Sequence, residues 1–219
     1  MPTTSDPGAV RTRDAQRSRD AILDAAETLF ARDGYEAVSL AAIGDAAGLS
    51  RGTPSYFFGS KEELYVAVLE RLYAARSAAL QPAFAPLAAW ADATRPEQPL
   101  RAVLTRSVEA YLRFLCERPA YVDLIEREAL AGGDRLRALE NQSTVMEETF
   151  GLLRRRARAH GLRSFDVDEV ILTLVGLGYA PVALRHTMLR RQGTAIDDPG
   201  FIAKRRNHVV DVLLHLLVP

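Results

Sequence analysis

Two short predicted helices meet at the tripeptide Gly48-Leu49-Ser50. This junction limits the number of folds that the chain can adopt. Ser39 can cap the first segment, and Ser50 can cap the second. Gly48 allows the positive φ that a tight turn between helices needs. Because helices this short are not stable alone, they require a longer helix to pack against.

The segment from Arg17 to Asp33 is predicted to be that supporting helix, and Gly34 can end it. Its apolar residues recur at the spacing i, i+3, i+4, i+7 and i+8, which gives a helix one buried face. They are Ile22, Ala25, Ala26, Leu29 and Phe30. The three segments together predict a helix-turn-helix arrangement.

The rest of the chain is also helical in period and shows no convincing strand pattern, so we predict an all-α fold of about nine helices. Ser60 and Glu63 fit a capping box that starts a long fourth helix, which should end near Leu80. The prolines between residues 82 and 99 indicate a linker-like stretch, although Phe84, Leu87 and Trp90 suggest that part of it packs.

Five further helices are predicted after that stretch, and the first two run from Leu100 to Leu115, closed by Pro119, and from Tyr121 to Leu130. One long helix is expected to run through Leu136 to Leu153. Residues 167–190 and 201–217 form the two most apolar helices, and Pro181 should bend the first of them. Gly176 and Gly178 would permit close packing there.

Several classes of function lack their sequence signals. The single cysteine, Cys116, excludes a disulfide framework, and its apolar neighbours favour a buried, inert thiol. The four histidines lack a metal-ligand spacing, and no nucleophile–base pair or phosphate loop is recognisable. We therefore expect no enzyme, no catalytic residue, no metal and no cofactor. With neither a signal peptide nor an apolar run of about 18 residues, a cytoplasmic protein without a membrane partner is expected.

A helix-turn-helix pair can place its second helix in the major groove of DNA. The N-terminal part of that helix is predicted to hold Arg51, Gly52, Thr53, Ser55 and Tyr56. Arg51 can bond guanine, and Thr53 and Ser55 can bond base edges or phosphates. Phosphate contacts are expected from Ser39, Tyr56 and Lys61. The pattern alone is also typical of tight corners in helical bundles.

The run from Arg19 to about Leu69 resembles the DNA-binding region of the TetR family of bacterial transcriptional regulators. The matching residues include Ile22, Ala25-Ala26, Leu29-Phe30, Gly34-Tyr35, Ser39, Ile43, Ala46 to Ser50, Gly52-Thr53, Tyr56 to Phe58 and Ser60 to Leu64. Two positions depart from the family pattern. Gly44 stands where alanine is usual, and Pro54 stands where leucine or a similar residue is common. Whether Pro54 itself meets a base is left open by the pattern.

The resemblance implies a homodimeric repressor that binds a double-stranded operator of two-fold symmetry and releases it when a small effector binds. It assigns phosphate contacts to Ser39, Tyr56 and Lys61, and places Thr53 and Ser55 on the recognition helix. The polar, proline-bearing residues 1–12 are predicted to be a disordered arm. The resemblance implies a DNA-binding domain over 13–62 and an effector-binding and dimerisation domain over 63–219. A helical ligand-binding or adaptor protein without specific DNA binding is the alternative.

Two further sites are predicted in the C-terminal part. Aromatic residues suggest a pocket for a small apolar or aromatic effector, although such stripes are more often core. The candidates are Trp90, Tyr111, Phe114, Phe150 and Tyr179. The last two helices are predicted to form the dimer interface through Val170, Leu174, Val210, Leu213, Leu214 and Leu217.

Overall fold

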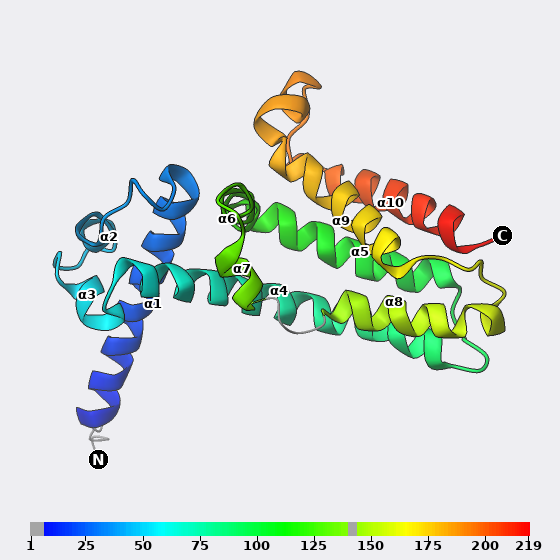
Figure 1. Ribbon diagram of the computed structural model, residues 1–219, viewed down its shortest axis with the longest axis horizontal. Coiled ribbons are helices and arrows are strands. Elements are labelled where there is room, and N and C mark those ends of the chain that lie inside the picture. The colour runs from blue at the N-terminus through cyan, green and yellow to red at the C-terminus, as the bar shows by residue number, and fades with distance from the viewer. Residues whose placement is uncertain (1–6, 140–143) are drawn as a thin grey trace, which may run out of the picture. The chain divides into compact units, whose positions relative to one another are not determined.

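The computed structural model describes residues 7–139 and 144–219, which form an all-α protein without a strand in those ranges (Figure 1). The chain divides into two compact units. The first holds the chain up to Leu72 together with Asp123–Leu136, and the second holds Tyr73–Val122 and the chain from Arg137 onward. A segment from the middle of the sequence therefore belongs with the N-terminal helices.

The first unit is built on α1, which carries the two short helices and the start of α4. The bounds are α1 Pro7–Asp33, α2 Leu40–Ala46, α3 Thr53–Phe58 and α4 Lys61–Asp92. The predicted apolar face of α1 is buried, since Ile22, Ala26 and Phe30 are inaccessible to solvent. α1 begins earlier than the period indicated. It includes residues 7–12 of the predicted arm, whose first six residues lie outside the described part of the chain.

Two of the three predicted helix caps are confirmed. The Ser39 hydroxyl accepts a hydrogen bond from the Ala42 amide at 3.1 Å. Ser60 and Glu63 form the reciprocal bonds of a capping box, at 2.8 Å and 3.1 Å. The Ser50 cap is wrong, because the Ser50 hydroxyl pairs with the Thr53 hydroxyl at 2.7 Å instead of with a backbone amide.

α3 consequently begins at Thr53, and Gly52 takes the cap position. Pro54 is then the second residue of the helix, where its missing N–H forfeits no helical hydrogen bond. Its side chain is buried against Gly44 of α2. A Cβ atom on Gly44 would lie 3.3 Å from Pro54 Cδ and 2.8 Å from the Ser50 carbonyl oxygen. The two departures from the family pattern therefore meet in space, and Pro54 points inward.

α4 continues well beyond the predicted end near Leu80. It passes through Pro82 and Pro86 and ends at Asp92, so the predicted linker is largely helix. The reason is packing, because Phe84 and Leu87 on one face of this stretch are fully buried. That burial outweighs the hydrogen bonds the two prolines remove.

The remaining helices follow in order along the chain. They are α5 Leu100–Glu117, α6 Pro119–Leu130, α7 Asp134–Leu139, α8 Val145–Arg156, the 3₁₀ turn Ala157–His160, α9 Val167–Ala183, the π-helical turn Arg185–Leu189 and α10 Phe201–Leu217. The single helix predicted from Leu136 to Leu153 is wrong. α8 begins after Thr144, which forms a capping box with Glu147, and residues 140–143 lie outside the described chain.

Pro181 lies inside α9 because a side chain replaces the hydrogen bond that it cannot make. A proline leaves the carbonyl four residues earlier without its helical donor, and here that carbonyl belongs to Leu177. Arg205 of α10 donates to the Leu177 oxygen from Nε at 2.9 Å and from Nη2 at 2.7 Å. Burial lowers the pKa of Arg205. This contact fastens α10 to α9.

Candidate nucleic-acid interface and cavities

The helix-turn-helix exposes the side chains expected to meet DNA and buries those expected to anchor it. Tyr56 is 84% exposed, and Ser55 beside it is also exposed. Phe58 is buried, with the Arg19 guanidinium 4.3 Å from its ring centre. α3 thus presents the Tyr56 phenol outward from an aromatic anchor, while the Ser55 hydroxyl donates to the Gly59 carbonyl at 2.9 Å.

Arg51 and Gly52 lie in the turn before α3, contrary to their expected place within the helix. Arg51 Nε is 3.2 Å from both carboxylate oxygens of Asp45, and both side chains are exposed. A base contact by Arg51 would therefore compete with this ion pair. Gly52 has φ −85°, and a Cβ atom there would meet nothing within 4 Å. Within the described chain, neither backbone strain nor crowding requires a glycine at position 52.

The three expected phosphate-binding residues sit at or near helix ends. Ser39 uses its oxygen as a cap acceptor, which leaves its hydroxyl proton free to donate. Lys61 Nζ donates to the Tyr35 carbonyl at 3.0 Å and lies 4.3 Å from the Tyr35 ring centre. An ammonium group has three donors, so Lys61 can still donate to a phosphate. The Tyr56 side chain is open to solvent.

A network of charged and aromatic residues lies behind Lys61, and the sequence analysis missed it. Arg135 of α7 holds Glu62 with two hydrogen bonds and also reaches Glu128. Hydrogen bonds first from Arg135 and then from Tyr35 hold the pKa of Glu62 below its usual range. Burial, reinforced by Glu128, raises the pKa of Tyr65. Glu128 is buried and ion-paired with Arg135, with Nη1 3.3 Å from Oε1.

The aromatic effector candidates do not gather in one cavity. Phe150 packs edge-on against Phe84, and Phe114 packs in the same way against Tyr121, with ring centres 6.4 Å and 5.1 Å apart. Tyr111 fills the space beside Gly178, where a Cβ atom would lie 2.6 Å from its ring. These three candidates are buried core residues, and their assignment to an effector pocket stays a prediction. Gly178 therefore serves packing within the chain.

The other two candidates are partly exposed. The Tyr179 hydroxyl donates to the Val122 carbonyl at 2.9 Å. Trp90 donates to the Gln98 carbonyl at 2.8 Å, and its ring lies tilted against His160 with ring centres 4.6 Å apart. Trp90 also lines a cavity of about 380 Å³ at the junction of α4 and α5. Its wall includes Pro86, Ala89, Ala93, Arg95, Pro96 and Arg106.

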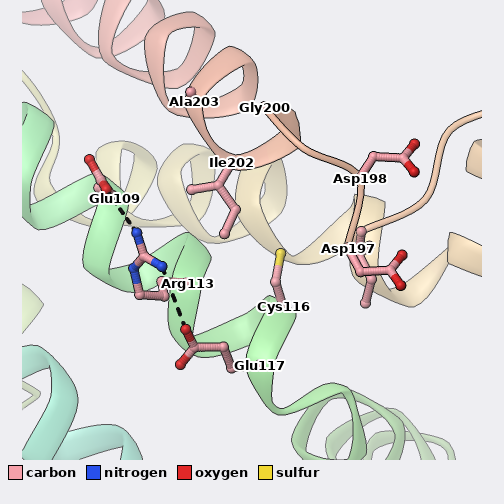
Figure 2. A pocket seen from close by; sticks show the side chains of 10 residues that line it. Glu109, Arg113, Cys116, Glu117, Asp197, Asp198, Gly200, Ile202 and Ala203 are labelled. Atoms are coloured by element: carbon pink, nitrogen blue, oxygen red, sulfur yellow. Dashed lines mark hydrogen bonds and ion pairs between the residues drawn. The ribbon is translucent and has the colours of Figure 1, made fainter.

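A second cavity, of about 360 Å³, lies between α5 and the segment that leads into α10. Figure 2 shows Arg113 between Glu109 and Glu117, and the Cys116 sulfur directed toward that segment. Asp197 and Asp198 add two more carboxylates to its lining. Burial first, and Glu117 second, raise the pKa of Cys116 to about 11, so its thiol stays protonated at neutral pH.

The outward face of α9 differs from the predicted interface. Val170, Leu174, Val210, Leu213 and Leu217 are buried within the single chain, and Leu214 is half-buried. The assignment of those five buried residues to a dimer contact is therefore wrong. The exposed face instead carries Leu172, 68% accessible, followed at intervals of four residues by Gly176, Ala180 and Leu184.

Within residues 7–139 and 144–219, no three His, Cys, Asp or Glu side chains are arranged to hold a metal ion. No helix in the same ranges combines the length and the apolar character needed to cross a bilayer.

Two short helices on a longer one, with outward hydroxyls and cations at helix starts, define a helix-turn-helix DNA-binding regulator. A family model described as bacterial regulatory proteins of the tetR family matches residues 22–68. Another, described as the C-terminal domain of tetracyclin repressor-like proteins, matches residues 99–213. The chain therefore belongs to the TetR family of bacterial transcriptional regulators.

Individual relatives agree with this placement. The chain is 30% identical over 184 residues to the transcriptional repressor NicS of Pseudomonas putida, and the match covers 82% of each protein. It is 39% identical over 82 residues to the transcriptional regulator RutR of Escherichia coli, a match that covers 36% of this chain and 39% of RutR. A solved structure of a putative transcriptional regulator from Streptomyces coelicolor has a TM-score of 0.63 at 20% identity, and covers 91% of this chain and 98% of its own. The last comparison concerns the fold alone.

Proposed function

We propose that this protein is a homodimeric repressor that binds a two-fold symmetric operator and releases it when a small apolar or aromatic effector binds. The observation that carries the DNA-binding part is the surface of α3 and its turn. There, an 84% exposed Tyr56 stands next to the open Gly52 and the exposed Ser55. An exposed aromatic phenol among hydroxyl groups suits contacts to phosphates and base edges.

The proposed contacts follow the geometry of α2, α3 and α4. Thr53 and Ser55 face base edges or phosphates, and Ser39, Tyr56 and Lys61 bind phosphates. Arg51 joins them when it leaves Asp45, since an exposed ion pair of this kind is worth only about 0–1 kcal/mol. Gly52 lets the backbone of the turn approach the DNA. Pro54 has no place among the contacts, because it is buried against Gly44.

We assign the dimer contact to the outward stripe on α9 that begins at Leu172. Residues four apart share one side of a helix, and an exposed apolar stripe is typical of a protein interface. Gly176 and Ala180 would let the partner helix approach closely. Dimerisation would then space two recognition helices about one DNA turn apart, roughly 34–36 Å.

The cavity beside Trp90 is the candidate effector site. Its alanines and prolines suit an apolar or aromatic body, and Arg95 adds a cation at its wall. Trp90 is the only tryptophan in the chain, so tryptophan fluorescence reports on the surroundings of this one cavity-lining side chain. A panel of small aromatic compounds should contain one that changes the fluorescence and weakens DNA binding at the same concentration. A compound that releases DNA without any change at Trp90 would move the effector to another site.

DNA binding is tested by selection from a pool of random-sequence duplexes with the full-length protein. A regulator should enrich one symmetric sequence and bind it with a steep dependence on salt. Failure to enrich any sequence would favour the alternative of a helical ligand-binding or adaptor protein.

A further inference from the structure

Two arginines of the segment Asp123–Leu136 hold the helices of the first unit. Arg127 donates to the Ala31 carbonyl from Nε at 3.1 Å and to the Arg32 carbonyl from Nη2 at 2.8 Å. Helices leave their last carbonyls unpaired, and a cation suits the negative end of the helix dipole. Arg127 therefore fixes the end of α1 directly before the connection to α2.

Arg135 divides its guanidinium between two carboxylates. Nε and Nη2 bond the two oxygens of Glu62 at 2.8 Å and 3.0 Å, while Nη1 lies 3.3 Å from Oε1 of Glu128. The guanidinium also lies 4.7 Å from the ring centre of Tyr35 and 5.3 Å from that of Tyr65. The pairing with Glu62 is thus two-pronged, and the pairing with Glu128 is partial.

The two carboxylates differ in their exposure to solvent and in their hydrogen bonding. The Glu62 side chain is 49% exposed, so water can replace Arg135 there. Glu128 is 3% exposed, and its Oε2 has no hydrogen-bond partner among the described residues. A buried carboxylate oxygen without a donor is rare and unfavourable. Arg135 reaches Glu128 only through Nη1 at 3.3 Å while Nε and Nη2 bond Glu62, so a two-pronged pairing with Glu128 requires the guanidinium to move toward it.

We propose that Arg135 is a positioning residue for DNA binding that alternates between two pairings. On Glu62 it holds the phosphate-binding residues in place, and on Glu128 it releases them. The proposal rests on the proposed function, because it concerns the same DNA contacts. It identifies the two arrangements of a small element on which the second unit can act.

The link to DNA runs through Tyr35 and Lys61. In the observed pairing Arg135 lies over the Tyr35 ring, and the Tyr35 carbonyl holds Lys61 Nζ. Glu62 directly follows Lys61 in the first turn of α4. When Arg135 leaves Glu62, the first turn of α4 loses its tie to α7, and the Tyr35 ring loses one of its two cations.

The second unit can reach this switch through the backbone. α6 is one continuous helix whose first residues, up to Val122, belong to the second unit, while Asp123 and those after it belong to the first. The chain returns to the second unit at Arg137, two residues after Arg135. A conformational change in the second unit can therefore displace both ends of the segment that carries Glu128 and Arg135.

Two substitutions of equal charge and size separate this switch from an ordinary ion pair. Glu62→Gln and Glu128→Gln each remove one negative charge and keep the side-chain volume. In the full-length protein, E62Q should weaken binding to the duplex selected by the wild type by about 5- to 100-fold, a typical range for coupled equilibria. E128Q should leave that affinity equal or higher. Loss of a negative charge near DNA would by itself strengthen binding, so bulk electrostatics cannot produce the E62Q result.

The controls concern folding and the arginine itself. Arg135→Gln should weaken binding as E62Q does. Arg101→Gln, which breaks an exposed pair with Asp211 in the second unit, should bind like the wild type. All variants are compared below the temperature at which any of them begins to unfold. The switch would be refuted if E62Q and E128Q changed the DNA affinity in the same direction, or if neither changed it. It would also be refuted if E128Q weakened binding and E62Q did not. A wild-type protein that selects no duplex would refute the proposed function and this proposal with it.

Discussion

Replacing Gly44 by alanine should destabilise the first unit, although alanine is the better helix former. Gly44 lies within α2, and the turn before α3 passes directly over it. An added Cβ atom would lie 2.8 Å from the Ser50 carbonyl oxygen and 3.1 Å from the Arg51 Cα atom. Both neighbours are backbone atoms, so no side-chain rotation can relieve the contact.

The expected size follows from two opposing effects. Replacing glycine by alanine inside a helix stabilises a protein by about 1 kcal/mol. Adding a methyl group to a filled site costs about 1–3 kcal/mol. The crowding at Gly44 involves the backbone of the turn, so the cost should fall in the upper half of that range. We expect Gly44→Ala to lower the free energy of unfolding by about 1–2 kcal/mol.

Urea unfolding followed by circular dichroism measures this change at a fixed protein concentration. Gly151→Ala is the matched control, because Gly151 also lies within a helix and the nearest atom to an added Cβ would be 3.5 Å away. G151A should raise the free energy of unfolding by about 0.5–1 kcal/mol. If G44A stabilised the protein as much as G151A, the turn would yield to the methyl group and the argument from crowding would be refuted.

Three other substitutions test separate parts of the structure. Leu172→Glu should give monomers in sedimentation because it places a charge on the exposed stripe. Leu213→Glu should instead prevent folding because Leu213 is fully buried. A dimeric, folded L172E would place the interface elsewhere. Arg205→Met should lower the free energy of unfolding by about 1–3 kcal/mol, because the Leu177 carbonyl loses both donors, and an unchanged urea midpoint would contradict this. Lys61→Gln should reduce the slope of log affinity against log salt by about 1 if Lys61 binds a phosphate, and an unchanged slope would exclude that contact.

The first unit was largely predictable because its signals are local. The period of α1, the Ser39 cap and the capping box at Ser60 each involve residues within one or two turns of each other. The start of α3 was misplaced for an equally local reason. Ser50 has the chemistry of a cap, but its hydroxyl pairs with the Thr53 side chain, and no sequence rule distinguishes these partners.

Contacts between distant residues were beyond reach. Pro82 and Pro86 obey a local rule that predicts a break, and the burial that overrides it comes from residues on other helices. Arg135 lies far from Glu62 in the sequence, so nothing near either residue indicates their pairing. The predicted interface failed for a related reason. The apolar composition of a helix indicates that the helix is buried. Which of its faces is covered within the chain depends on the helices that pack against it.

Gly44 and Pro54 show how two apparent irregularities can be one feature. Taken separately, the glycine should loosen α2 and the proline should disturb α3. In the structure a Cβ atom on residue 44 would lie 3.3 Å from Pro54 Cδ, so the two positions are in direct contact. Pro54→Leu alone would place a bulkier, more flexible side chain beside Gly44. A double-mutant cycle with G44A and P54L should therefore show an interaction energy of about 0.5–3 kcal/mol in magnitude. Additive effects within about 0.5 kcal/mol would mean that the two positions do not share a contact that matters for stability.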